Sequence, residues 1–248
     1  MDLEIVNPQP KYPPVQLIDP PQLGYIHVAA AVGPPAQPGP PVPRRSREKT
    51  ALFTRLKSLA TELEKLSEVV KATVYHAIVV PPPGGYAKDR AGHVARYDVV
   101  VLIETTSPEV IAEVQGAEPY TLLLGALTAA AKDVHVMKAR CVRRVGDVDK
   151  SRQGLFLFNY FVAEDAQVAL ALWDHLAGWY AVATGLDNST LLAPIGDADY
   201  VFVNHARWDY SLPRFMVRQF TKPSFWTYLR ANLLVNRTGA MPILYRLA

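Results

Sequence analysis

The feature that most constrains the fold of this chain is an order of secondary-structure elements that occurs twice. Apolar runs indicate strands, and apolar residues at helical spacing indicate helices. In the first half the order is strand, helix, strand, strand, helix, strand, predicted over residues 24–32, 47–66, 72–80, 96–105, 107–130 and 134–145. In the second half the same order is predicted over residues 154–162, 165–184, 189–195, 199–208, 212–234 and 240–248.

A βαββαβ unit is typical of the ferredoxin-like fold, an antiparallel sheet with both helices on one face. The strands here are apolar at nearly every position, as in "DVVVLI" (98–103), which indicates that both faces of each sheet are buried. Two such sheets in one chain can cover each other. We therefore predict an α+β fold of two ferredoxin-like βαββαβ repeats, residues 23–150 and 151–248, whose sheets pack into a barrel-like sandwich.

Proline dominates the beginning of the chain, where 12 of the 21 prolines lie within the first 43 residues. Because proline fixes its own φ and restricts the residue before it, residues 1–22 are expected to form an extended arm on the surface or on a partner subunit. A disordered tail is the alternative for the first dozen residues. The segment 34–41 favours a stiff loop over a docking ligand for an aromatic groove.

Composition limits the classes of function. The apolar runs are too short for a membrane-spanning helix, the N-terminus lacks the pattern of a signal peptide, and Cys141 alone allows no internal disulfide. A cytoplasmic protein with a packed thiol at Cys141 is the expectation. The net charge is +3, and the basic clusters 44–47 and 140–144 contain no interleaved aromatics, so we expect no nucleic-acid partner. Because no segment is long enough to span a membrane, we expect no membrane partner either. No metal or nucleotide motif is found.

The second half carries stretches that point to a known family: "GLFLFNYF" (154–161), "WDHLAGWY" (173–180) and "YVFVNHARWD" (200–209). With the two-repeat architecture, they resemble the dimeric α+β barrel superfamily in a tandem, single-chain form, and in particular its antibiotic-biosynthesis-type monooxygenase and stress-response domains. The resemblance implies clefts between sheet and helices that hold small organic molecules or haem. Its members include cofactor-free oxygenases, haem proteins and proteins without known activity, so fold alone does not decide function.

The strand around residue 205 is the first candidate site. Asn204, His205 and Arg207 stand where the matched strand of the first repeat, aligned by Tyr97 and Tyr200, has Val101, Leu102 and Glu104. Strand alternation places His205 and Arg207 on one side and Asn204 on the other, with Trp208. A histidine and an arginine could move a proton and hold an anion. In the structural alternative, Arg207 forms an ion pair with Asp209, and the hydrogen bonds of the His205 ring are met by neighbouring protein groups.

The helix 165–184 carries the second candidate site. Trp173 and Tyr180 share a face with Trp179 adjacent, a pattern that fits either a substrate platform or a core. His175 lies off that stripe and is an axial ligand only if the protein binds haem. The resemblance adds Asn159 by position and Trp226 as an indole, but residues 221–234 lack the histidine of haem-degrading members.

These observations predict a small-molecule-binding barrel protein, with cofactor-free monooxygenation of an aromatic or phenolic substrate as its activity if it is an enzyme. The catalytic candidates are His205, Arg207, Asn159 and Asn204, and the candidate walls are Trp173, Trp179, Tyr180 and Trp226. One alternative is a non-catalytic stress-response protein that forms homo-oligomers through its proline-rich arm and sheet edges. The other is a haem-binding protein.

Overall fold

The computed structural model describes residues 2–36, 39–82, 86–87 and 94–248. The first half contains β1 (Gly24–Ala30), α1 (Arg47–Leu63), β2 (Val69–Val79), β3 (Val99–Thr105), α2 (Ile111–Gly116), α3 (Glu118–Ala130) and β4 (Val134–Gly146). The second contains β5 (Leu155–Ala163), α4 (Ala166–Thr184), β6 (Ser189–Pro194), β7 (Phe202–Trp208), α5 (Leu212–Phe220), the π-helix η3 (Phe225–Arg230), α6 (Ala231–Val235) and β8 (Thr238–Leu247).

The eight strands form one closed antiparallel barrel in the order β1, β3, β2, β8, β5, β7, β6, β4. Each half supplies four consecutive strands, and the halves join where β2 pairs with β8 and β4 pairs with β6. Closure leaves no free sheet edge. The predicted α+β fold is confirmed, and the two sheets are continuous rather than merely stacked.

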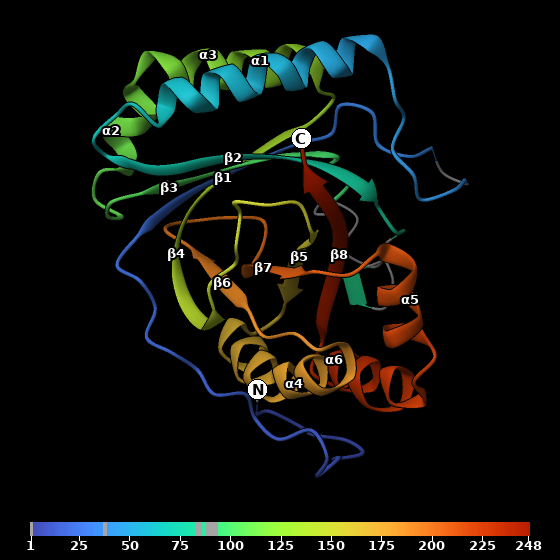
Figure 1. Cartoon of the computed structure of the whole chain (residues 1–248). Helices are drawn as coiled ribbons and strands as arrows, with labels where there is room; N and C mark the ends of the chain where they lie inside the picture. Colours follow the sequence, from blue (N-terminus) through green and yellow to red (C-terminus); the bar gives the residue numbers. More distant parts are fainter. Residues whose placement is uncertain (1, 37–38, 83–85, 88–93) are drawn as a thin grey trace.

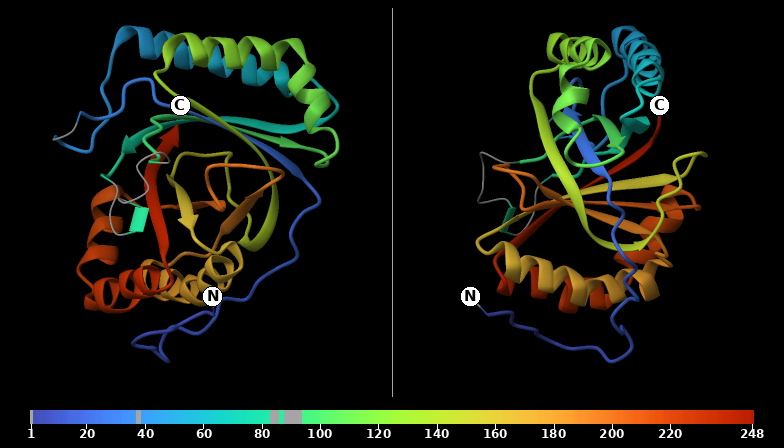
Figure 2. Two further views of the ribbon diagram at one scale, coloured as in Figure 1. Left: turned by 180° about the vertical axis from the view of Figure 1, so that it is seen from behind. Right: turned by 90° about the vertical axis from the view of Figure 1, so that its left-hand side faces the viewer.

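Helices cover the barrel on two opposite sides (Figures 1 and 2). One side carries α1 and α3 of the first half, and the other carries α4, η3 and α6 of the second. The interior is aromatic: Tyr75, Phe158 and Tyr245 pack there with almost no exposed surface. The hydroxyls of Tyr97 and Tyr200, which the sequence places at equivalent points of the two repeats, are 3.0 Å apart in this interior.

Local sequence signals explain where the helices begin. The side chain of Ser46 accepts a hydrogen bond from the Lys49 amide and caps the start of α1. The expected continuous helix 212–234 is wrong in one respect, since it breaks after Phe220 into α5, η3 and α6. Pro223 lies at the break because proline has no amide hydrogen to donate within a helix. Pro119 stands in the same way at the start of α3, which separates it from α2.

The described part of the arm, residues 2–22, contains neither helix nor strand and runs along the outer side of α4 and α6 (Figure 1). Tyr12 is its anchor, with a ring stacked on Tyr228 and a hydroxyl 2.7 Å from Ser224 Oγ. Residues 37–38 of the proline-rich loop 34–41 lie outside the described residues, as do residues 83–85 and 88–93 between β2 and β3. None of the helices described here is long and apolar enough to cross a membrane.

Candidate functional site

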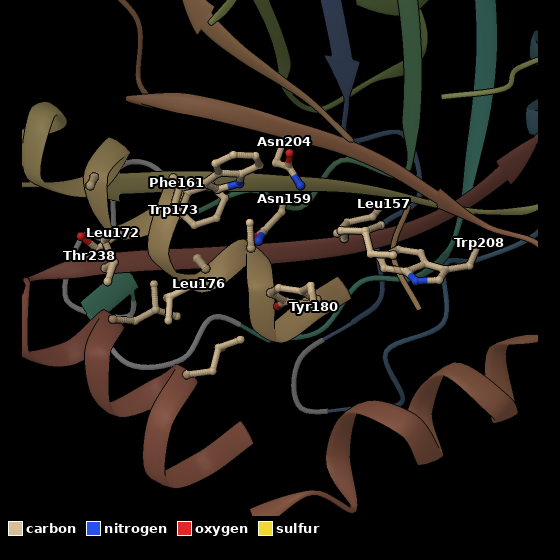
Figure 3. Close-up of a pocket in the computed structure, with 16 residues that line it drawn as sticks. Leu157, Asn159, Phe161, Leu172, Trp173, Leu176, Tyr180, Asn204, Trp208 and Thr238 are labelled. Atoms are coloured by element: carbon tan, nitrogen blue, oxygen red, sulfur yellow. The ribbon is translucent and has the colours of Figure 1, made fainter. Parts of the chain in front are cut away.

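A pocket lies between the outer face of β5, β7 and β8 and the helices α4, η3 and α6 (Figure 3). This inner chamber has a volume of about 40 Å³ and is walled mostly by leucine, alanine and aromatic side chains. It adjoins an outer chamber of about 210 Å³, which shares Asn159 and Tyr180 and extends to Tyr86, Trp226 and Arg230. The two chambers form one cleft that leads from the surface to the barrel wall.

Two asparagines stand at the inner end of this cleft. Asn159 and Asn204 are paired across β5 and β7. Asn159 is 4% exposed, and its Oδ1 has no hydrogen-bond partner within the described structure. Asn204 Oδ1 accepts a hydrogen bond of 2.6 Å from Ser189 Oγ, and its amide nitrogen is turned toward Asn159 (Figure 3). An apolar chamber therefore ends in one unsatisfied acceptor next to an amide donor.

Strand alternation explains why these two residues meet. Leu157, Asn159 and Phe161 of β5 line the pocket, while Phe158 and Tyr160 between them pack inside the barrel. Successive side chains of a strand point to opposite faces, so a polar residue at this parity must face the helices. The same rule places Asn204 and Trp208 of β7 on one side of the strand, as the sequence predicts, and both line the pocket.

The predicted walls divide into two groups. Trp173 and Tyr180 of α4 line the inner chamber, and Trp226 lines the outer one. Trp179 does not reach the cleft, because its side chain points to the other side of α4, where its Nε1 donates to Ser224 Oγ at 3.0 Å. The aromatic residues of α4 are thus divided, since Trp173 and Tyr180 line the cleft and Trp179 packs in the core.

His205 lies inside the barrel, away from the cleft, and is 1% exposed. Its Nε2 is 3.1 Å from the Tyr75 hydroxyl and its Nδ1 is 3.1 Å from the Leu157 carbonyl oxygen. The ring stacks on Phe158 with centroids 4.2 Å apart. Burial lowers the pKa of His205 to about 3, with a smaller contribution from the positive charge of Lys150. The structure does not bring this histidine to the asparagines.

Arg207 shares that interior side and is 3% exposed. Its Nη2 forms an ion pair with Asp209 at 2.7 Å and donates to the Gln153 carbonyl oxygen at 2.9 Å. This is the ion pair of the structural alternative. The anion-holding role predicted for Arg207 therefore has no support from its position.

Whether the cleft could hold haem depends on the axial ligands that its side chains offer. Histidine, cysteine, methionine and tyrosine are the protein's axial ligands to haem iron. Among the described residues that line the two chambers, only Tyr86 and Tyr180 belong to this set. Burial raises the pKa of Tyr180 to about 12, which keeps its hydroxyl protonated at neutral pH. The Tyr86 hydroxyl donates to Glu164 Oε1 at 3.0 Å. The described residues that line the cleft therefore do not fit a haem iron.

His175 lies off the aromatic stripe, where the simplest structural expectation is an exposed surface histidine, but the structure does not leave it exposed. It is partly buried on the outer side of α4, with its ring 5.9 Å from that of Tyr228. Its Nε2 is buried without a hydrogen-bond partner in the described structure, and burial lowers its pKa. Because it lies beside the arm rather than in the cleft, it cannot ligate a group bound there.

Among the lining residues that sequence reasoning missed are Leu229 and Leu233 of the roof and Thr238 of β8. All three follow the break at Pro223, which the sequence reading took as part of one helix. The sulfur of Cys141, by contrast, is buried as predicted, and burial raises its pKa to about 11. No cluster of three or more metal-ligating side chains of the His, Cys, Asp or Glu type occurs in the described part of the chain.

No protein-family model matches the chain, and no curated protein matches it in sequence. Solved structures do match. An anthrone oxidase-like protein superposes with a TM-score of 0.61 and 11% identity, over 91% of each chain. A protein described as "Putative monooxygenase (FN1347)" from Fusobacterium nucleatum superposes with a TM-score of 0.57 and 4% identity, over 91% of each chain.

The likeness extends over nearly the whole chain and therefore covers both halves of the barrel. At such low identities it establishes architecture and leaves chemistry to the site. The chain has an α+β barrel fold in common with these structures, and it supplies all eight strands of the barrel itself.

Proposed function

We propose that this protein binds a flat aromatic molecule carrying a hydroxyl or enol group in the cleft, and oxidises it as a cofactor-free monooxygenase. The observation that carries the proposal is the buried, unpartnered Oδ1 of Asn159 at the end of an apolar chamber. A buried acceptor without a partner costs about 1–3 kcal/mol, so a ligand that supplies a donor there gains affinity.

The chambers define the shape of the ligand. The inner one takes only the leading edge of a molecule, and the remaining rings lie in the outer one between Tyr180 and Trp226. At the inner end, a ligand hydroxyl donates to Asn159 Oδ1, and a neighbouring ligand oxygen accepts from the amide nitrogen of Asn204. Apolar walls with a few convergent polar groups are typical of small-molecule sites.

The charges of the cleft restrict the chemistry. No histidine, lysine or carboxylate stands among the described lining residues of the two chambers, and Arg230 is the single cation at the outer end. A protonated Tyr180 donates hydrogen bonds but does not abstract a proton. The substrate must therefore be acidic enough to ionise with help only from hydrogen bonds to the oxyanion that forms.

Such an enolate or phenolate is itself the reductant. An activated methylene group loses two hydrogens, one atom of O₂ becomes the new carbonyl oxygen, and the other leaves as water. The substrate proton passes to water in the outer chamber, the amide nitrogen of Asn204 donates to the oxyanion, and the aromatic walls shield the reacting carbon. The anthrone oxidase-like and monooxygenase neighbours lend support at the level of fold, and the first suggests anthrone as a test compound.

The test compares anthrone with 9,10-dihydroanthracene, which has a similar ring system but no oxygen. We expect anthrone to bind at least about tenfold more tightly, because dihydroanthracene leaves the buried amides without partners. With anthrone, oxygen consumption and anthraquinone formation should exceed the spontaneous rate and return to it in Asn159→Leu. Equal affinity for the two compounds would reject recognition by the asparagines, and binding without oxygen consumption would reject the oxidation.

A further inference from the structure

The charges of this chain are unevenly distributed. Residues 210–248 contain six of its 26 lysines and arginines and none of its 23 aspartates and glutamates. The residues before them therefore carry more acids than bases, although the whole chain has a net charge of +3. A charge asymmetry of this kind points to an anionic partner for the basic part.

Four of these cations lie on α5, on η3 and in the segment between them, and Arg230 also lines the outer chamber. They form a basic collar: Arg214, Arg218, Lys222 and Arg230. None of them pairs with a carboxylate in the described structure, whereas the neighbouring Arg237 is held by Glu164 at 2.8 Å. The guanidinium groups lie over aromatic rings instead: Arg214 and Arg218 over Tyr210, and Arg230 over Trp226 at 5.1 Å. The positive charges of the collar are therefore available to an anionic partner.

Large apolar side chains are exposed within the same collar and form an apolar rim: Met216, Val217, Phe220, Trp226 and Leu234. Val217 is 59% exposed and Trp226 is 49% exposed. Helical spacing puts the three α5 members of the rim on one face, and the rings of Phe220 and Trp226 are 6.4 Å apart. Grouped exposed apolar residues mark a surface that contacts something other than water.

The rim and the entrance to the cleft are the same place. Phe220, Trp226 and Leu234 line the outer chamber as well as the surface. The arm does not cover them, because it lies on the other side of α6, where Asn232 and Asn236 bond to the main chain of Val6 and Glu4. Helix α5 and the helical segment that follows it form one corner of the molecule (Figure 1).

We propose that this corner docks on the surface of a lipid bilayer that contains anionic headgroups. The collar pairs with the headgroups, and the rim enters the boundary between headgroups and acyl chains, as in interfacial helices with a basic and an apolar face. Tryptophan is enriched at that depth because its ring is apolar and its N–H is polar.

A second copy of this chain is a poorer occupant, since a two-fold contact through the same face would place one collar against another. Nucleic acid would neutralise the collar but would leave aliphatic side chains such as Val217 without a role. The sequence expectation of no membrane partner rested on the absence of a spanning segment, which a peripheral contact does not need. The proposal does not depend on the proposed function, although a cleft that opens at a bilayer would receive apolar ligands dissolved in it.

The test is sedimentation of the full chain with vesicles of phosphatidylcholine alone or with one third phosphatidylglycerol. We expect binding to the anionic vesicles, weakened by salt, and little binding to the neutral ones. Trp226 supplies a second readout, because the other three tryptophans are buried. Its fluorescence should shift to the blue and be quenched by brominated lipids.

Two sets of variants separate the collar from the rim. Arg214→Gln/Lys222→Gln/Arg230→Gln should reduce partitioning on the order of a hundredfold, at roughly fivefold per cation. The matched control, Arg44→Gln/Arg45→Gln/Lys57→Gln, removes three exposed cations elsewhere. It should reduce partitioning onto the anionic vesicles by a factor several times smaller. Val217→Ser/Phe220→Ser should abolish quenching by brominated lipids, while Val70→Ser/Leu122→Ser should not.

The proposal is overturned if the wild-type protein ignores both kinds of vesicle or if the two charge variants lose binding equally. It is also overturned if nucleic acid binds and vesicles do not, or if the rim variant sediments and quenches like the wild type. Circular dichroism on each variant shows that it is folded. A failure of anthrone to bind would leave all of these vesicle results unchanged.

Discussion

Asn204 and His205 are neighbours along β7, yet their side chains lie on opposite sides of the barrel wall. Asn204 lines the cleft beneath the helices, and His205 is enclosed by aromatic rings in the interior. The two residues therefore have different roles, Asn204 in the cleft and His205 in the core of the barrel. Changes at the first should affect ligands, and changes at the second should affect the stability of the barrel.

Asn159→Leu should leave the free energy of unfolding unchanged or raise it by about 1–2 kcal/mol, because it removes a buried acceptor that has no partner. The same change at Asn204 should lower it by about 1–2 kcal/mol, because Ser189 Oγ then loses its acceptor. Urea denaturation of both variants measures the difference. A loss of stability in Asn159→Leu as large as that in Asn204→Leu would show that the Asn159 amide is satisfied in the folded protein.

Stability should fall in acid because of the interior histidines. Burial lowers the pKa values of His27 and His205 to about 3, whereas an unfolded histidine titrates near 6.5. Between pH 6.5 and 3 the unfolded chain binds protons that the folded chain does not. Each histidine therefore removes up to about 1.4 kcal/mol per pH unit as the pH falls through this window.

Urea denaturation at pH 7 and pH 5 measures this loss, and His205→Gln should reduce it. The ring signals of His205 in NMR should stay those of a neutral imidazole down to about pH 4 and should not move when an aromatic ligand is added. A His205 pKa near 6.5 that shifts with ligand would instead return this residue to the site.

Much of the fold follows from the sequence, because strand and helix periodicities are local signals and the βαββαβ order admits few arrangements. The parity of β7 is also local, so the opposite placement of Asn204 and His205 could be predicted. The features that depend on tertiary packing could not be predicted from the sequence. The sequence shows that His205 and Arg207 share a side, but not that this side is a filled barrel interior rather than a cleft.

The roof of the cleft is the clearest case. The sequence of residues 212–234 predicts one long helix, but the structure breaks it at Pro223, and Leu229 and Leu233 after the break line the inner chamber with Asn159. Similarly, nothing in the local pattern of α4 distinguishes Trp179, which the arm covers, from Trp173, which it leaves to the cleft.

A buried ion pair joins α1 to the end of the interstrand segment before β3. Lys49 Nζ bonds to Asp98 Oδ2, and the two Asp98 carboxylate oxygens also accept from the amides of Val32 and Gly33 at 2.7 and 2.9 Å. Lys49→Met should lower the free energy of unfolding by about 3–5 kcal/mol, since it leaves a buried carboxylate without its cation. Lys57→Met, an exposed change on the same helix, should alter it by less than about 0.5 kcal/mol. Similar melting temperatures for the two variants would contradict this account.

The close approach of the arm to α4 makes Gly178 irreplaceable. A Cβ atom at this position would lie 2.0 Å from the carbonyl oxygen of Pro13, so Gly178→Ala should lift the arm off the helix. Gly125 of α3 is the matched control, because a Cβ there meets nothing within 4 Å, and Gly125→Ala should stabilise the protein by about 0.5–1 kcal/mol. Hydrogen exchange measures the first effect at the amides of Glu4 and Val6, which are held by Asn236 and Asn232.

Release of the arm should also weaken ligand binding in the cleft. The ring of Tyr12 packs in one cluster with Leu172, Leu176 and Leu229, and these leucines line the inner chamber as well. Without the arm they lose support on their outer side, so Gly178→Ala should weaken ligand binding although no residue of the cleft is changed. Protected Glu4 and Val6 amides in Gly178→Ala would mean that α4 yields instead of the arm. Exposed amides with unchanged ligand affinity would show that the roof holds its shape without the arm.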